Sequence, residues 1–207
     1  MQLSTGLYRL LEFSGVYDRL QSVLRKRTGQ RYVKEYIRPF DRCRILDIGC
    51  GTGSILQFLP ENVHYVGFDL NPDYILTARK RYGQRGKFLN ARIEALSDLK
   101  EGAFDIALAS GVLHHIDDKE AAAAIRSAYE ILRPGGNLVT LDPAYVAGQP
   151  WLARGLISRD RGKNVRTPES YLELTQKHFP KVESWIVSDL LRIPYTHFVM
   201  RCEKPIQ

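Results

Sequence analysis

The strongest constraint on the fold is a glycine-rich stretch at residues 45–54, which reads Ile-Leu-Asp-Ile-Gly-Cys-Gly-Thr-Gly-Ser. Its apolar first half is typical of a buried parallel strand, and the alternating glycines predict a tight turn that a ligand can approach closely. The apolar residues at 55–59 then predict a helix that ends at Pro60. Such a strand, turn and helix N-terminus bring several backbone N–H groups to one place. The stretch therefore predicts an α/β fold with a ligand site at this turn.

Three kinds of nucleotide site share these parts, and the spacing of the residues separates them. A P-loop ends in Gly-Lys-Ser/Thr, whereas this stretch contains no lysine. The dinucleotide fingerprint has glycine or alanine at its sixth position, where this chain has Ser54. The remaining pattern at residues 47–53, Asp-Ile-Gly-Cys-Gly-Thr-Gly, resembles the first motif of the class I S-adenosylmethionine (SAM)-dependent methyltransferases. A tight turn that binds no ligand is the alternative at this point.

A second acidic residue, Asp69, ends the next predicted strand, at residues 63–69. It lies roughly twenty residues past the turn, where an open α/β fold places a carboxylate that accepts both hydroxyls of a ribose. The alternative is that Asp69 only caps the following helix. Asn71 and Pro72 also indicate that a helix begins at this point. The spacing from the first motif favours the ribose interpretation.

The sequence after Asp69 continues the alternation of helices and strands. Helices are expected at about 74–82 and, behind Asp117 or Asp118 as N-cap, up to the Arg-Pro-Gly-Gly turn that starts at Arg133. Strands are expected at 87–90, 104–111, 137–142, 182–187 and 197–202. The Leu-His-His run at 113–115 and the turn at 132–136 resemble later motifs of the same family, so the matches cover residues 41–142 in order.

The resemblance implies a doubly wound, mostly parallel seven-stranded sheet, the Rossmann-like methyltransferase fold, with an antiparallel strand at one edge. A length of 207 residues suits one domain. We expect a single SAM-dependent methyltransferase domain over 1–207, divided into an N-terminal helical cap at 1–40, a SAM-binding core at 41–142, a substrate lid at 143–180 and closing strands at 181–207. A helix with Thr167 as N-cap and Pro168 at its first position should lie in the lid and run through about His178.

The resemblance also implies SAM as the cofactor and assigns its contacts residue by residue. The methionine part would be held by Asp47, Ile48, Gly49, Cys50, Gly51, Thr52 and Gly53, the ribose and the adenine edge by Asp69 and Leu70, and the amino group by the end of the fourth strand at Ser110 and Gly111. Family members carry an Asp after the third strand that binds the adenine amino group, but this chain has Arg92 there. The backbone N–H of Ile93 could still bind the ring, with Asn90 or Glu94 substituting for the missing carboxylate. Tyr17 is a candidate cover for the cofactor, although aromatic residues at this spacing more often pack in a core.

Methyl transfer from SAM is a direct displacement, so proximity and orientation can supply most of the rate. A side-chain base is needed only if the acceptor keeps its proton until the transition state, and His115 is the catalytic candidate for that role. The alternative is that His115 only lines the pocket, and His114 and Asp142 are candidate substrate contacts. A metal site from His115 with Asp117 or Asp142 has no His-x-x-His spacing or acidic cluster to support it, so we expect no metal.

The lid sequence predicts the character of the acceptor. Its substrate candidates are the aromatic residue Tyr145 and the cations Arg159, Arg161 and Arg166. Arginine favours bidentate recognition of phosphate or carboxylate, so we expect an acceptor that combines an apolar or ring portion with an anionic group. The alternative is a solvated basic loop that contacts no substrate.

Composition decides between classes of partner only weakly. The net charge of +7 suggests an anionic partner, but there is no Asn/Asp-Pro-Pro-Tyr/Phe sequence after residue 109 and no appended nucleic-acid-binding module. We therefore expect a small-molecule acceptor such as a sugar, polyketide, quinone or lipid precursor, methylated on O, N or C, and no nucleic-acid partner. The alternatives are an RNA or protein methyltransferase and a non-catalytic SAM-binding regulator. Three cysteines without Cys-x-x-Cys spacing, no transmembrane segment and no signal peptide favour a cytoplasmic monomer or homodimer.

Overall fold

The computed structural model describes residues 28–91, 103–160, 162–191 and 193–206. The expected helices before residue 28 lie outside this part of the chain. So do the candidate site residues Tyr17, Arg92, Ile93 and Arg161, together with Glu94.

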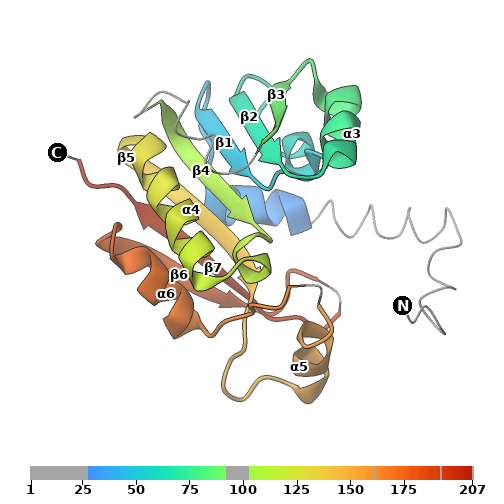
Figure 1. The fold of residues 1–207 in the computed structure, drawn as a ribbon, viewed down its shortest axis with the longest axis vertical. Helices are drawn as coiled ribbons and strands as arrows, with labels where there is room; N and C mark the ends of the chain where they lie inside the picture. Colours follow the sequence, from blue (N-terminus) through green and yellow to red (C-terminus); the bar gives the residue numbers. More distant parts are fainter. Residues whose placement is uncertain (1–27, 92–102, 161, 192, 207) are drawn as a thin grey trace, which may run out of the picture.

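A seven-stranded sheet organises the described chain, in the order β3-β2-β1-β4-β5-β7-β6 (Figure 1). Its strands are β1 (Arg44–Ile48), β2 (His64–Asp69), β3 (Gly86–Asn90), β4 (Phe104–Ser110), β5 (Leu132–Pro143), β6 (Lys181–Val187) and β7 (His197–Glu203). Strands β1 to β5 pair in parallel, and β7 is antiparallel to both β5 and β6. The predicted fold class is therefore confirmed, with the antiparallel strand lying one position in from the edge.

Alternation along the parallel strands supplies apolar side chains to both faces of the sheet. Ile45 of β1 belongs to one core cluster and Leu46 to the other, as expected for a strand that is covered on both sides. One face is covered by the π-helical turn η1 (Val33–Ile37) and by α3 (Pro72–Tyr82). The other is covered by α4 (Asp118–Ile131) and α6 (Pro168–Gln176), which lie side by side (Figure 1).

Two helix N-termini follow the expected capping chemistry. Asp117, rather than Asp118, is the N-cap of α4, and it forms a capping box with Glu120. Thr167 caps α6 ahead of Pro168. These caps fix where the two helices that cover one face of the sheet begin.

Four elements differ from the sequence prediction. The helix expected at 55–59 was wrong, because only a 3₁₀ turn, η2 (Ser54–Gln57), forms before the Phe58 amide bonds back to Ile55. Strand β5 starts five residues earlier than expected, since Leu132 pairs with Phe104 across a bulge. The lid carries an unpredicted helix, α5 (Trp151–Ile157), and α6 ends at Gln176 rather than about residue 178. Among the described residues, no helix has the length and apolarity needed to cross a membrane.

Candidate cofactor and acceptor site

The glycine turn after β1 forms a tight cradle at the carboxyl end of the parallel strands. Gly49 and Gly51 have φ angles of 70° and 53°, a backbone region that other residues rarely adopt. A Cβ added at Gly49 would lie 2.5 Å from a Val112 methyl, whereas one at Gly51 would meet nothing within 4 Å. The cradle is therefore closed beneath Gly49 and open at Gly51, which leaves room for a ligand against the backbone.

Asp69 is aimed at this cradle from the end of β2. One carboxylate oxygen accepts the Gly51 N–H at 2.9 Å, and the other accepts the Asn71 N–H at 2.8 Å. Helix α3 is capped by the Asn71 side chain instead, which accepts from the amides of Asp73 and Tyr74. A carboxylate has about four acceptor positions, so Asp69 retains capacity for two ribose hydroxyls.

Asp47 lies beneath the same turn and is 4% exposed. The Tyr65 hydroxyl donates to its carboxylate at 2.5 Å. The pKa of Asp47 is raised to about 7, mainly by burial; the Tyr65 hydrogen bond opposes the shift, and the nearby Asp69 charge adds to it. A buried carboxyl poised in this way suits a cationic ligand group, such as the ammonium of an amino acid.

The end of β4 forms the remaining wall of the described cofactor site. Ser110 shares a hydrogen bond of 2.8 Å with the Tyr32 hydroxyl, and the Gly111 amide donates to the Leu141 carbonyl at 2.7 Å. Strand pairing sets Ile48 beside both Phe68 of β2 and Ala109 of β4. The structure thus gathers at one edge of the sheet the predicted residues Asp47, Ile48, Gly49, Cys50, Gly51, Thr52, Gly53, Asp69, Leu70, Ser110 and Gly111.

The described residues fit the SAM cofactor that the fold implies. The open backbone at Gly51 would take the methionine part, and Asp69 the ribose hydroxyls. Asp47 would supply the counter-charge of the ammonium, for which the end of β4 at Ser110 is the other expected contact. The Asn90 amide nitrogen donates to the carbonyls of Asp69 and Leu70 at 2.9 Å each, and its amide oxygen is the atom that the adenine contact considered above would use.

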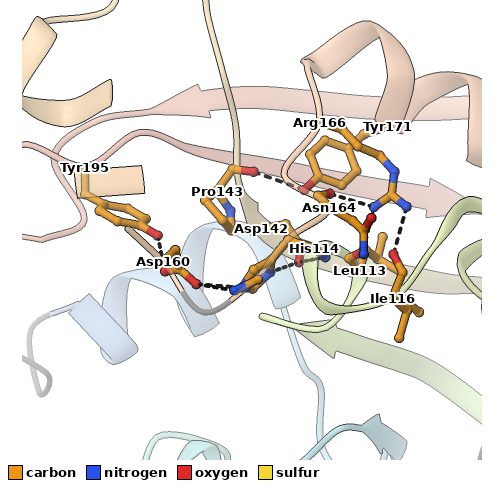
Figure 2. Close-up of polar contacts among 11 residues, drawn as sticks. Leu113, His114, Ile116, Asp142, Pro143, Asp160, Asn164, Arg166, Tyr171 and Tyr195 are labelled. Carbon is orange, nitrogen blue, oxygen red and sulfur yellow. Dashed lines mark hydrogen bonds and ion pairs between the residues drawn. The ribbon is translucent and has the colours of Figure 1, made fainter. Parts of the chain in front are cut away.

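A second polar cluster lies beyond the ends of β4 and β5 (Figure 2). His114 is buried, and its Nδ1 lies 2.7 Å from a carboxylate oxygen of Asp142, while its Nε2 lies 3.4 Å from Oδ1 of Asp160. Asp160 also accepts from the Tyr195 hydroxyl at 2.6 Å and from the Gly162 amide at 3.0 Å. Burial raises the pKa of Asp142, and the hydrogen bond with His114 opposes that shift.

His115 occupies a different environment from its neighbour. It is exposed, and its ring centroid lies 4.0 Å from that of His114. Both histidines belong to the short turn η4 (Leu113–His115) that follows β4. Sequence reasoning missed Asp160 and Tyr195, although Asp160 is the single acidic residue of the 144–166 lid sequence.

The lid cations are placed very differently from one another. The Arg166 guanidinium is almost buried and donates to the carbonyls of Leu113, Asn164 and Ile116 at 2.6–3.0 Å (Figure 2). It also donates to the Asp118 carboxylate at 2.8 Å. Its charge is therefore used to hold the lid to the start of α4.

Arg159 and Tyr145 lie on parts of the lid beside α5. Arg159 is exposed and makes one hydrogen bond, of 3.1 Å, to the Gly155 carbonyl. The guanidinium of Arg154 lies 4.9 Å from the centroid of the Tyr145 ring. The Arg159 guanidinium has five N–H donors, so this one bond leaves most of them for a ligand.

Comparison with known proteins identifies the family. A model described as a methyltransferase domain matches residues 45–136. The chain is 26% identical over 149 residues to human thiol S-methyltransferase TMT1A, covering 70% of this chain and 60% of that protein. It is 31% identical over 152 residues to the ubiquinone biosynthesis O-methyltransferase of Cereibacter sphaeroides, covering 67% of this chain and 60% of that protein. The match to the Xylella fastidiosa protein of the same name spans only 42% of that protein's length.

A solved structure shows the same fold. N-methyltransferase NodS from Bradyrhizobium japonicum, in complex with S-adenosyl-L-homocysteine, superimposes with a TM-score of 0.68 at 18% identity, covering 88% of each chain. The matched region contains both the Asp47–Gly53 turn and Asp69. Residues 45–136 therefore match the methyltransferase-domain family, and the sequence and fold comparisons together support a class I SAM-dependent methyltransferase whose cofactor is S-adenosyl-L-methionine.

Proposed function

We propose that this protein transfers a methyl group from SAM to an oxygen, nitrogen, carbon or sulfur atom of a small acceptor. The observation that carries the proposal is the placement of two sites at one edge of the sheet. The Asp47–Asp69 cradle follows β1 and β2, and the His114–His115 turn with its lid follows β4 and β5. In open α/β folds, ligands bind at this carboxyl edge where the strand order reverses, which here is between β1 and β4.

Each of three site residues, Asp47, Asp69 and His115, has a separate role in this proposal. SAM, when bound, supplies a methyl group already activated by its positive sulfur. Asp47 pairs with the ammonium and Asp69 with the ribose, so that the cofactor is held in one orientation. His115, exposed beside the lid, accepts the proton of a hydroxyl, amine or thiol acceptor.

The acceptor is proposed to carry an anionic group. Arg159 supports this proposal, because it is exposed on the lid and has unused donors. Arg161 belongs to the same proposal and lies outside the described residues, whereas Arg166 supports the lid from within. The names of the relatives favour small acceptors, since they include a thiol S-methyltransferase, a ubiquinone biosynthesis O-methyltransferase and a phosphoethanolamine N-methyltransferase.

Transfer of a radiolabelled methyl group tests the proposal directly. The purified protein is incubated with labelled SAM and a cell extract, which is then separated into small molecules, RNA and protein. We expect the label in the small-molecule fraction with the wild type and a much lower yield with Asp69→Ala. Label in RNA or protein would overturn the choice of acceptor, and binding of SAM without transfer into any fraction would indicate a regulator.

A further inference from the structure

We propose that His114, His115 and Asp160 form a binding site for one divalent transition-metal ion, with Zn²⁺ as the first candidate. One ligand atom from each of these three residues lies within 4.8 Å of the other two. Two imidazole nitrogens and one carboxylate oxygen are a donor set that suits zinc and its neighbours rather than Mg²⁺ or Ca²⁺.

The orientation of His114 is the first argument. Its Nδ1 lies 2.7 Å from Asp142, a contact in which the imidazole N–H donates to the carboxylate. This hydrogen bond places the lone pair of the ring on Nε2, the nitrogen that faces Asp160. A carboxylate that holds the opposite nitrogen is the usual support of a metal-binding histidine.

The distance from His114 to Asp160 is the second argument. The Nε2 and Oδ1 atoms are 3.4 Å apart, whereas a charge-assisted hydrogen bond from an imidazolium would be about 2.7–2.9 Å long. Two ligands bound to one tetrahedral zinc ion at roughly 2.0–2.2 Å are separated by about 3.4 Å. The observed separation therefore matches two ligands that share an ion.

Asp142 adds an independent observation. It is 2% exposed, and its second oxygen, Oδ2, is buried with no hydrogen-bond partner among the residues that the structure describes. This oxygen belongs to the carboxylate on the Nδ1 side of the His114 ring, so it is not a ligand of an ion at Nε2, and what Asp142 adds to the site is its negative charge. Asp142 and Asp160 flank one imidazole, and a divalent cation would balance both negative charges.

The surroundings of Asp160 hold it in place for this role. The Tyr195 hydroxyl and the Gly162 amide each donate to its carboxylate, at 2.6 Å and 3.0 Å. Because Asp160 lies between α5 and α6 while the histidines follow β4, the ion would join the lid to the core of the domain. Three protein ligands leave a fourth position for water or a substrate atom.

The metal site does not depend on methyl transfer, and binding of SAM does not depend on the ion. With the ion bound, His115 is a ligand. The base role proposed above then applies to the metal-free protein.

Titration of metal-stripped protein with Zn²⁺ tests the site. Calorimetry should show one ion per chain with a dissociation constant of about 1 µM or tighter, and elemental analysis after gel filtration should find one zinc ion per chain. Co²⁺ in its place should give the visible absorption of a four-coordinate complex. Absence of stoichiometric zinc would overturn the proposal.

Matched variants locate the ion. Asp160→Asn keeps the size of the side chain and should weaken Zn²⁺ binding at least tenfold, as should His114→Ala. His64→Ala removes an exposed histidine at the start of β2 and should bind like the wild type. Because His114 is buried and His114→Ala can fail to fold, Asp160→Asn is the deciding variant. Unchanged zinc affinity in folded Asp160→Asn would overturn the assignment.

Discussion

At the scale of single residues, two carboxylates with different surroundings lie at the proposed cofactor site. Asp47 is buried beneath the glycine turn, and its proton is retained up to near neutral pH. Asp69 is half-buried and receives two backbone amides, from Gly51 and Asn71. The first is suited to an ammonium, which needs a buried counter-charge, and the second to hydroxyl groups, which need free acceptor positions.

The variant Asp69→Ala should bind SAM at least about tenfold more weakly than the wild type. The change removes charge-assisted hydrogen bonds to two hydroxyls, each of which contributes roughly 1.5–3 kcal/mol. Calorimetric titration measures the effect, and Asp73→Ala, which removes an exposed acid four residues later on α3, is the matched control. Equal affinities for the two variants, with both folded, would contradict the role of Asp69.

The raised pKa of Asp47 predicts a pH dependence of SAM binding. An ammonium binds the ionised carboxyl, so affinity should decrease as the pH falls below about 7. A tenfold loss per pH unit is the limiting slope for one proton. The control ligand is 5′-methylthioadenosine, which lacks the amino-acid portion and should bind with little change over the same pH range.

The same group has the opposite effect on the stability of the free protein. Its pKa rises from 3.8 in the unfolded chain to about 7 in the fold, so the folded state binds more protons between these values. Stability contributed by this group should therefore fall as the pH rises from about 4 to 7 and then level off. In the binding experiment, an equal loss of affinity for SAM and for 5′-methylthioadenosine at low pH would point to a group other than Asp47.

His115→Ala tests the proposed base. In the metal-free protein, kcat should fall by roughly 10²–10⁴ while SAM affinity stays near the wild-type value, because the imidazole touches the acceptor rather than the cofactor. The zinc content of the variant is measured alongside kcat. A loss of kcat below about tenfold would leave His115 as a wall of the pocket.

At the scale of elements, the sequence predicted the strands and capped helices well and the lid poorly. The ends of β4 were predicted to within one residue, because a parallel strand that is buried on both faces has a continuous run of apolar residues. The N-caps Asp117 and Thr167 could be predicted because helix capping depends on a short local sequence pattern. Helix α5 was missed because it has only seven residues, too few to establish a period.

Arg166 is expected to stabilise the lid as an element. Arg166→Ala leaves the carbonyls of Leu113, Asn164 and Ile116 without their charged donor, so it should lower the free energy of unfolding by roughly 2–4 kcal/mol. Chemical denaturation measures this loss.

The matched variant Arg159→Ala removes an exposed arginine from the same lid. It should unfold like the wild type but raise KM for an anionic acceptor and weaken the salt dependence of that KM. Unchanged acceptor kinetics would contradict the proposed anion contact.

At the scale of the whole molecule, the sheet order explains which parts of the site could be predicted. The cofactor residues follow adjacent strands β1, β2 and β4, so motif spacing along the chain already indicates that they meet. The His114–Asp142–Asp160–Tyr195 cluster draws one residue each from η4, β5, the lid and the approach to β7. No local pattern connects these four segments, because their meeting depends on how the lid folds back over the sheet.

Binding of SAM should stabilise the domain as a unit, since the ligand joins groups from β1, β2 and β4, which pair side by side at the centre of the sheet. At a SAM concentration one hundred times the dissociation constant, the folded state gains about 2.7 kcal/mol. For a chain of this length, that gain corresponds to a rise in melting temperature of roughly 5–10 °C. Thermal unfolding with and without SAM measures the shift, and Asp69→Ala should lose at least about half of it at the same SAM concentration. Adenosine alone should give a smaller shift, because it cannot engage Asp47 through an ammonium. An equal shift for adenosine and SAM in the wild type would show that the buried carboxyl takes no part in holding the cofactor.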